Sequence, residues 1–389
     1  MMNDRIARQF AFLNEADRLK SVLRSNVLQD LSRRENSAEH SWHVALYALA
    51  FAPISADGVS VPRAIRMLLL HDLVEIDVGD HPIHENVDWA EVAAREEQAA
   101  RRLFSLLPQD QATDCLALWT EFEAGETPDA GFAKMLDHSQ PLFQALCAPE
   151  PLPEHVEIVR ENLDTGRARR LQHVFPAAYA HANALLHGTS TSDAGDVTTR
   201  IDFLNEADRL KSVMRATMTL DAARQENSGE HSWHIALYAM ILAEHANRPV
   251  NADRVIQMLL IHDLVEIDVG DVPIHSQDGA AHGSAEIQEA EARAADRIFG
   301  LLPEDQAAEL RALWEEFEAA ESDDAVFAKS IDRVQPCLAN LKTGGRSWVD
   351  YNVTYEQVEA RVGTKVTRGA PAVWAHLQVP IRAWFEANT

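Results

Sequence analysis

Cysteine, basic charge and long apolar runs are all in short supply in this sequence of 389 residues. The three cysteines, Cys115, Cys147 and Cys337, form no CxxC pattern and cannot all pair, which predicts a reduced chain and a cytoplasmic location. Lys and Arg number 35 against 61 Asp and Glu, and the net charge of −26 disfavours a surface that wraps nucleic acid. No run of 18 apolar residues occurs and the N-terminus has no apolar signal core, so we expect neither a membrane span nor secretion.

What the sequence does contain is an internal repeat. FLNEADRLKSVLR at 12–24 returns as FLNEADRLKSVMR at 203–215, an offset of 191. ENSAEHSWH at 35–43 returns as ENSGEHSWH at 226–234, and LLLHDLVEIDVGD at 68–80 returns as LLIHDLVEIDVGD at 259–271. The best-matched stretches are rich in His, Asp and Glu. Core packing tolerates drift in detail, so a repeated His–Asp pair inside an apolar run indicates a chemical role.

The pattern predicts an all-α protein with two similar domains. Leu, Ala, Glu and Arg dominate long segments with apolar residues at helical spacing, and strand-like alternation is hard to find. We place the first domain at 1–187, a polar linker at 188–200 and the second domain at 201–389. Predicted N-caps at Asn36 and Asn227 put both EHSWH segments in the first turn of a helix. Further helices are expected at 67–78, ended by Gly79, and at 88–107, 109–124 and 129–147.

The expected helix at 67–78 is apolar nearly all round, yet it carries His71, Asp72 and Glu75. Burying two carboxylates costs several kcal/mol unless something compensates, and a divalent cation does so compactly. His40 from the preceding helix and the later Asp137 would complete a His/His/Asp/Asp set. Mixed imidazole and carboxylate ligands suit Mn²⁺, Fe²⁺, Co²⁺ or Zn²⁺ better than Ca²⁺.

The order H…HD…D, with RLKSV, ENSxEHSWH, HDLVEIDVGD and a later KxxD, resembles the HD-domain metal-dependent phosphohydrolases, and more narrowly their 5′-deoxynucleotidase-like branch. The resemblance covers about 12–147 and 203–365. It implies two tandem helical bundles, each with one divalent metal ion, packed as an intramolecular pseudo-dimer. The implied activity is removal of phosphate from nucleoside 5′-monophosphates or related nucleotides by metal-activated water. The expected partner is thus a small phosphorylated substrate, with no nucleic acid polymer and no membrane.

Carried over residue by residue, the resemblance assigns three roles in each half. The metal ligands would be His40, His71, Asp72 and Asp137, and His231, His262, Asp263 and Asp332. The acid/base carboxylates would be Glu75 with Asp80, and Glu266 with Asp271. The phosphate-binding arginines would be Arg24 and Arg215, each expected at the end of a helix.

The sequence departs from the branch in two places. The phosphate-binding arginine is followed by Trp in the bacterial branch but by Ser25 and Ala216 here, which removes the expected basis for preferring deoxyribose. The second half contains TGGRSW at 343–348, whereas the first half has lost this element altogether. If a single site turns over substrate, we expect it to be the second.

Several alternatives remain open from the residues alone. A buried His–Asp pair can be a core hydrogen bond, Glu75 can support a ligand without reacting, and helix-end arginines often complement the helix dipole. The repeated His43, His234, His84 and His275 are expected to be structural or to line the pocket. A di-iron oxygenase would need further histidines, for which His282 is a candidate but Glu91 stands at the equivalent first-half position. A nucleotide-sensing protein with one inactive domain is the non-enzymatic alternative.

Overall fold

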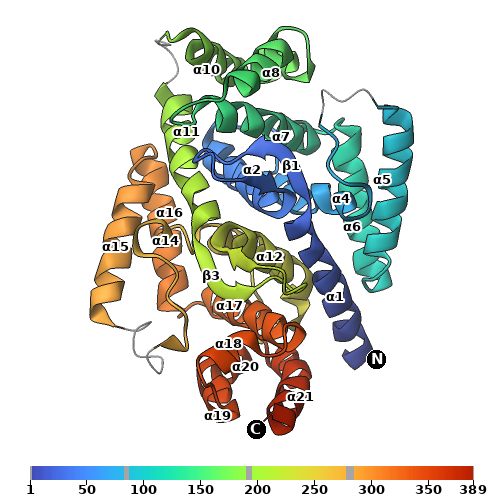
Figure 1. Cartoon of the computed structure of the whole chain (residues 1–389), viewed down its shortest axis with the longest axis vertical. Coiled ribbons are helices and arrows are strands. Elements are labelled where there is room, and N and C mark those ends of the chain that lie inside the picture. The colour runs from blue at the N-terminus through green and yellow to red at the C-terminus, as the bar shows by residue number, and fades with distance from the viewer. Residues whose placement is uncertain (1, 83–86, 190–194, 277–283, 389) are drawn as a thin grey trace.

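The structure is a computed structural model that describes residues 2–82, 87–189, 195–276 and 284–388, and it is dominated by helices (Figure 1). The main elements of the first half are α1 (Met2–Ala16), β1 (Leu23–Val27), β2 (Arg34–Asn36), α2 (Ser37–Phe51), α3 (Val61–Leu70), α4 (Glu75–Val78), α5 (Trp89–Phe104), α6 (Gln109–Ala124), α7 (Pro128–Leu146), α8 (Pro153–Asp164), α9 (Leu171–Val174) and α10 (Pro176–His187). Those of the second half are α11 (Gly195–Asp208), β3 (Met214–Met218), β4 (Gln225–Asn227), α12 (Ser228–Leu242), α13 (Ala252–Ile261), α14 (Glu266–Val269), α15 (Ala285–Phe299), α16 (Glu304–Ala319), α17 (Asp323–Lys342), α18 (Arg346–Asp350), α19 (Tyr355–Val358), α20 (Thr364–Gly369) and α21 (Pro371–Asn388).

The helices α2 and α12 form the centre of the molecule. Every residue of α2 is buried, and α12 is buried at all its positions but one. A helix that is buried all round needs neighbours on every side. For α2 these are α3 and α7 of its own half, and α11 and α12 of the other. In Figure 1 the pair α5 and α6 and the pair α15 and α16 lie on opposite sides of this centre.

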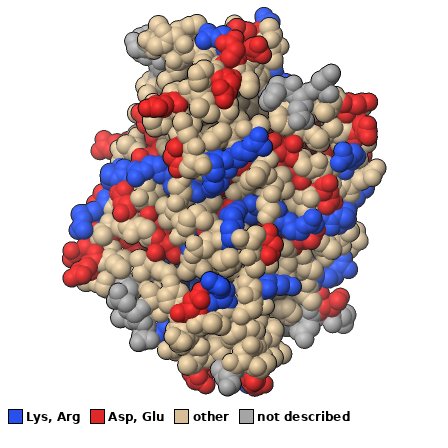
Figure 2. Space-filling view, in the orientation of Figure 1, with Lys and Arg blue, Asp and Glu red and all other residues tan. Residues whose placement is uncertain are grey.

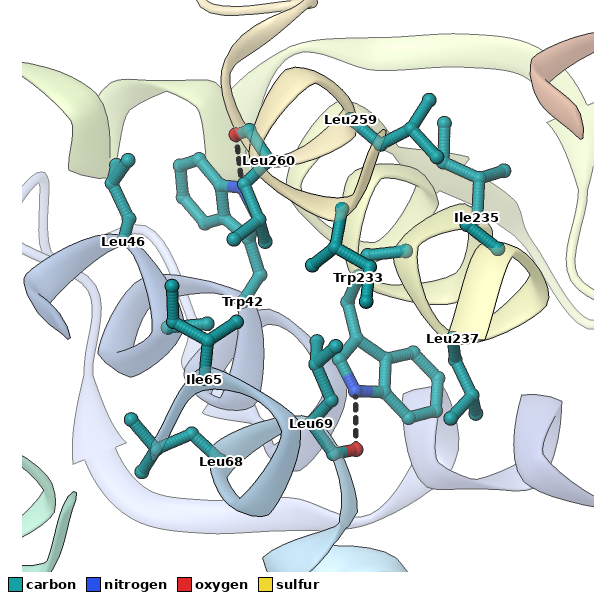
Figure 3. Close-up of a cluster of buried hydrophobic side chains, with 14 of the residues drawn as sticks. Trp42, Leu46, Ile65, Leu68, Leu69, Trp233, Ile235, Leu237, Leu259 and Leu260 are labelled. Atoms are coloured by element: carbon teal, nitrogen blue, oxygen red, sulfur yellow. Dashed lines mark hydrogen bonds between the residues drawn. The ribbon is translucent and has the colours of Figure 1, made fainter. Parts of the chain in front are cut away.

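The two halves share one apolar core and exchange contacts in a reciprocal manner. Helix α1 of the first half packs on α12, and α11 of the second half packs on α2. Trp42 donates its indole N–H to the carbonyl of Leu260 at 3.0 Å, and Trp233 donates to the carbonyl of Leu69 at 3.1 Å. Figure 3 shows both indoles between the α2–α3 and α12–α13 pairs. These contacts favour the pseudo-dimer, which stays a prediction for the protein in solution.

The predicted helix caps are present, whereas two local predictions differ from the structure. Asn36 and Asn227 each cap a helix in a capping box with Glu39 and Glu230. The expected helix at 67–78 is broken: α3 ends at Leu70, residues 71–74 form a 3₁₀ turn, and α4 follows. The tighter turn changes the directions of the side chains from those of a continuous helix. Helix α4 ends at Val78, and Gly79 follows it with a φ of 80°, which residues other than glycine rarely adopt.

The second difference is a pair of short antiparallel hairpins, β1–β2 and β3–β4. Arg24 lies in β1 and Arg215 in β3, so neither stands at a helix end as expected. In each hairpin the first strand has five residues and the second has three, and the register between the paired ends is irregular. Strands this short show no alternation of apolar and polar residues in the sequence. The N-cap residue of the following helix needs an extended backbone, and this favours the second strand of each hairpin.

The C-terminal parts of the two halves differ most. The first half continues from α7 into α8–α10, at one end of the view in Figure 1, whereas the second continues into α18–α21 at the other. Helix α11 begins at Gly195, inside the expected linker, and the division at 188–200 stays a prediction. No helix in the described part of the chain is long and apolar enough to cross a membrane.

The surface carries charges of both signs. On the face in Figure 2, Lys and Arg side chains lie among Asp and Glu side chains. Equivalent ion pairs in the two halves, Arg102 with Asp77 and Arg297 with Asp268, hold α5 to α4 and α15 to α14. Exposed pairs of this kind contribute little to stability, about 0–1 kcal/mol each.

Candidate metal and phosphate site

The structure brings the predicted ligands of the first half together at the break between α3 and α4. His71 and Asp72 begin the 3₁₀ turn, and His40 reaches them from the first turns of α2. His40, His71 and Asp72 can each offer a ligand atom, with these atoms within 4.8 Å of one another. Asp137 on α7 places Oδ1 3.0 Å from His40 Nε2 and 3.6 Å from His71 Nε2. All four predicted ligands therefore converge.

The ring orientation of His71 leaves one of its two nitrogens without a hydrogen-bond partner. Its Nδ1 lies 2.8 Å from the carbonyl oxygen of Leu68, so Nδ1 carries the proton and donates. Its Nε2 is buried and has no hydrogen-bond partner. His262 repeats both features, with Nδ1 donating to Leu259 at 2.8 Å and an orphaned Nε2. A buried acceptor without a donor is costly, whereas a neutral imidazole with its other nitrogen hydrogen-bonded is the usual form of a metal ligand.

The residues present fit a divalent metal ion. The donor set is two imidazole nitrogens and two carboxylates, and each orphaned Nε2 faces into this set. The carboxylates in the cluster also affect one another strongly. Burial and the neighbouring Asp72 raise the pKa of Glu75 well above its ordinary value, because two anions are held close together in a dry site. A cation at the cluster would relieve this repulsion.

Arg24 lies beside the cluster and contacts its carboxylates. Its Nη1 donates to Asp72 Oδ2 at 2.8 Å and lies 3.6 Å from Glu75 Oε1 and 3.9 Å from Asp80 Oδ1. The guanidinium is placed by β1, whose next residue, Ser25, donates its backbone N–H to Asp80 at 3.3 Å. Burial and the charge of Arg24 act oppositely on Asp80, and the net effect raises its pKa. The predicted acid/base carboxylates thus lie together with the predicted phosphate-binding arginine.

The second half repeats this geometry. His231 Nε2 lies 3.1 Å from Asp332 Oδ1, and His262 Nε2 lies 2.9 Å from Asp263 Oδ1. Arg215 Nη1 donates to Asp263 Oδ2 at 2.7 Å. The remaining predicted residues are in place, as Arg215 Nη1 lies 3.8 Å from Glu266 and 3.7 Å from Asp271.

Each site opens into a cavity, and the two cavities differ. The first-half cavity has a volume of about 580 Å³ and is lined on one side by α8 and the residues after it, including His155, Asn162 and Arg167. The second-half cavity has about 150 Å³ and is lined by Trp348 and Tyr351, in and after α18. Loss of the TGGxSW element from the first half therefore accompanies a larger cavity.

The remaining histidines divide into two kinds. His275 lines the second cavity, as expected, and burial together with Arg361 and Arg333 lowers its pKa to about 4. His43 and His234 are fully buried at the boundary between the halves, away from both cavities. His84 and His282 lie outside the described residues. Glu91, at the position where a di-iron enzyme would need a histidine, is exposed on α5.

Two kinds of residue were missed at the sequence level. Glu35 and Glu226 lie directly before the helix caps, and each places a carboxylate oxygen near Nδ1 of a predicted ligand, His40 or His231, at 3.4 and 3.6 Å. Lys134 and Lys329 line the two cavities one turn before Asp137 and Asp332. All four fall in matched stretches of the repeat, and this was the signal available for finding them.

Comparison with known proteins agrees with this geometry. A family model described as HD domain matches residues 16–179 and 207–374, which together exceed half of the chain. The chain therefore belongs to the HD domain family and contains two copies of the domain. The predicted family, the predicted helical fold and the tandem arrangement are confirmed.

Individual relatives match with lower coverage. The 5′-deoxynucleotidase HDDC2 of Homo sapiens is 33% identical over 135 residues, covering 34% of this chain and 65% of that protein. The Bos taurus protein of the same name is 33% identical over 146 residues, covering 37% of this chain and 70% of its own. This chain thus spans about two thirds of the length of these relatives. A 5′-deoxynucleotidase of Yersinia pestis is 26% identical over 164 residues, covering 41% of this chain and 83% of that protein.

Among solved structures, the chain is similar to a predicted metal-dependent phosphohydrolase from Magnetospirillum magnetotacticum MS-1. It is 41% identical, covers 51% of this chain and 97% of its own, and superposes with a TM-score of 0.47.

Proposed function

We propose that this chain is a divalent-metal-dependent phosphohydrolase that removes phosphate from nucleoside 5′-monophosphates or closely related nucleotides. One observation carries the proposal: in both halves a His/His/Asp/Asp cluster with an orphaned imidazole Nε2 lies beside a buried arginine and two further carboxylates. Relatives named 5′-deoxynucleotidase support the nucleotide class.

The metal ligands are assigned to the two clusters. They are His40, His71, Asp72 and Asp137 in the first half and His231, His262, Asp263 and Asp332 in the second. When bound, a divalent ion supplies a Lewis acid for the phosphoryl oxygens and lowers the pKa of water. The ligand types admit Mn²⁺, Fe²⁺, Co²⁺ and Zn²⁺.

The other residues of the site act on the phosphate and on protons. Arg215 presents a guanidinium to the cavity and would bind the phosphate, and its charge would stabilise the negative charge that builds up on the transferring group. Glu266 and Asp271 have pKa values raised by burial and by neighbouring carboxylates. A carboxyl group tuned upward in this way can exchange a proton with water or with the leaving alkoxide. Arg24, Glu75 and Asp80 would act in the same way in the first half.

The sugar preference follows from the strand beside the arginine. Ser25 and Ala216 follow the two arginines and line the cavities with small side chains. Neither would obstruct a ribose 2′-hydroxyl. We therefore propose that ribonucleotides and deoxyribonucleotides are both accepted.

The test is release of inorganic phosphate from ribo- and deoxyribonucleoside 5′-mono-, di- and triphosphates, with metal-stripped protein resupplied with Mn²⁺, Co²⁺ or Zn²⁺. Asp72→Ala and Asp263→Ala each inactivate one site, and the double variant is expected to lose more than about 100-fold of the activity. Asp268→Ala, an exposed aspartate on α14 paired with Arg297, is the matched control and should leave turnover unchanged. No metal-dependent release from any nucleotide would refute the proposal.

A further inference from the structure

Two lysines are fully buried at the boundary between the halves. Lys20, after α1, and Lys211, after α11, each have no exposed surface. An isolated ammonium in such a place would lose its charge, because burial disfavours the charged form. The nearby carboxylates outweigh this effect and raise the pKa of both lysines, so each remains a cation.

Each ammonium binds a carboxylate of the other half. Lys211 Nζ donates to Glu35 Oε1 at 2.7 Å, and Lys20 Nζ donates to Glu226 Oε2 at 2.9 Å. The second oxygen of each glutamate faces the outer nitrogen of a proposed metal ligand. Glu35 Oε2 lies 3.4 Å from His40 Nδ1, and Glu226 Oε1 lies 3.6 Å from His231 Nδ1. The nearer partners of these two nitrogens are Gln140 Oε1 at 3.1 Å and Gln335 Oε1 at 3.2 Å. Each glutamine in turn donates its amide N–H to the same glutamate, at 3.2 and 3.0 Å. A chain of contacts therefore runs from a lysine of one half to a metal ligand of the other.

The repeated His43 and His234 complete this arrangement. His43 Nε2 donates to the carbonyl of Leu204 at 3.0 Å, which leaves Nδ1 as an acceptor for Lys211 Nζ at 2.8 Å. His234 does the same with Leu13 at 2.9 Å and Lys20 at 3.1 Å. The spacing of Glu35, His43 and Asp208 would also suit a metal ion. The ammonium of Lys211 contacts all three, so this cluster already holds its cation.

We propose that Lys211 is a positioning residue for the first-half metal site and Lys20 for the second, so that each site is completed by a lysine from the other half. A polar oxygen held at the outer nitrogen of a ligating histidine fixes the ring and its tautomer. Here that oxygen belongs to Gln140 or Gln335, and the glutamate holds the glutamine through its amide N–H and lies beside the same nitrogen. The lysine holds that carboxylate in place and pairs its charge. The inference rests on the proposed metal sites but adds that neither half is self-sufficient.

The test uses proteins with one site and measures metal binding. His262→Ala/Asp263→Ala leaves the first site, and His71→Ala/Asp72→Ala leaves the second. Lys20→Met and Lys211→Met are placed in each background, and Mn²⁺ affinity is measured by isothermal titration calorimetry. The two lysines are equally buried and make equivalent contacts with an aspartate, a glutamate and a histidine, so each is the matched control for the other. Lys211 has one further contact, with Gln144 at 3.1 Å.

A crossed pattern is expected. In the protein with only the first site, Lys211→Met should weaken Mn²⁺ binding about 10- to 100-fold, and Lys20→Met should leave it nearly unchanged. In the protein with only the second site, the effects should be exchanged. Equal effects of both variants in both backgrounds would assign the lysines to general stability and overturn the inference. Absence of Mn²⁺ binding in both parent single-site proteins would instead refute the proposed metal sites.

A second pair of variants tests the inference if the single lysine variants do not fold. Removing one cation from a buried cluster leaves its carboxylates uncompensated, which is strongly destabilising. Lys211→Met/Asp208→Asn and Lys20→Met/Asp17→Asn remove a pair of opposite charges while still releasing the glutamate of the other half. The same crossed pattern is expected from them. If these double variants also fail to fold, the lysines act on the fold itself and the inference is wrong.

Discussion

Trp42 in the first half donates its indole N–H to the carbonyl oxygen of Leu260 in the second half, at 3.0 Å. Leu260 lies two residues before His262, so this bond ties one half to the backbone that presents the proposed metal ligands of the other. Trp233 and Leu69 form the equivalent bond at 3.1 Å. The proposed sites are thus supported from across the boundary by backbone contacts as well as by the buried lysines.

Trp42→Phe tests the energy of this contact. Phenylalanine retains most of the apolar volume but leaves the Leu260 carbonyl without its donor in a fully buried position. We expect the free energy of unfolding to fall by about 1–3 kcal/mol, measured by urea denaturation. Trp119→Phe is the control, because Trp119 is also buried but its indole nitrogen has no hydrogen-bond partner. An equal loss in the two variants would show that the hydrogen bond contributes nothing.

The boundary also predicts how stability depends on pH. Burial and the adjacent Lys211 hold the pKa of His43 well below its ordinary value of 6.5. The unfolded chain therefore binds more protons than the folded one below pH 6.5, and stability falls as the pH drops. His43 should contribute a slope of about 1.4 kcal/mol per pH unit in this range.

His43→Gln isolates that contribution, because glutamine retains a donor and an acceptor but does not titrate. Urea denaturation at several pH values between 5 and 6.5 should give a shallower dependence for the variant than for the parent protein. Above pH 7 the two dependences should run parallel. Parallel curves below pH 6.5 as well would contradict the prediction.

The sequence predicts those features of the structure that neighbouring residues determine, and it does not predict those that depend on contacts between distant residues. The caps at Asn36 and Asn227 and the three later helices follow from residue type and spacing, and the convergence of His40 with His71 and Asp72 follows from the repeated motif. The turn at 71–74 and the strands that hold Arg24 and Arg215 were not predictable, because they have too few residues to show a period. The glutamates that pair with Lys20 and Lys211 lie 206 and 176 residues away in the sequence, and nothing in local patterning indicates such contacts.

The packing of the halves predicts a compact monomer. Helices α2 and α12 bury their facing surfaces on each other inside one chain, which leaves these surfaces unavailable for a second copy. A compact chain of this length has a radius of gyration of about 21 Å. Small-angle X-ray scattering should give this value, and light scattering should give the mass of one chain, 43.3 kDa. An extended shape with two separate masses would contradict the pseudo-dimer.

The unequal cavities predict unequal substrate ranges. The first-half cavity, at about 580 Å³, has room for a larger substrate than the second, at about 150 Å³. Asp263→Ala leaves the first site and Asp72→Ala leaves the second. We expect kcat/KM for a 5′-phosphorylated dinucleotide, relative to a mononucleotide, to be at least about tenfold higher at the first site. Tyr351→Ala, which removes an exposed side chain from the wall of the second cavity, should bring the ratio of the second site towards that of the first. Equal ratios at both sites would show that cavity volume does not set the substrate range.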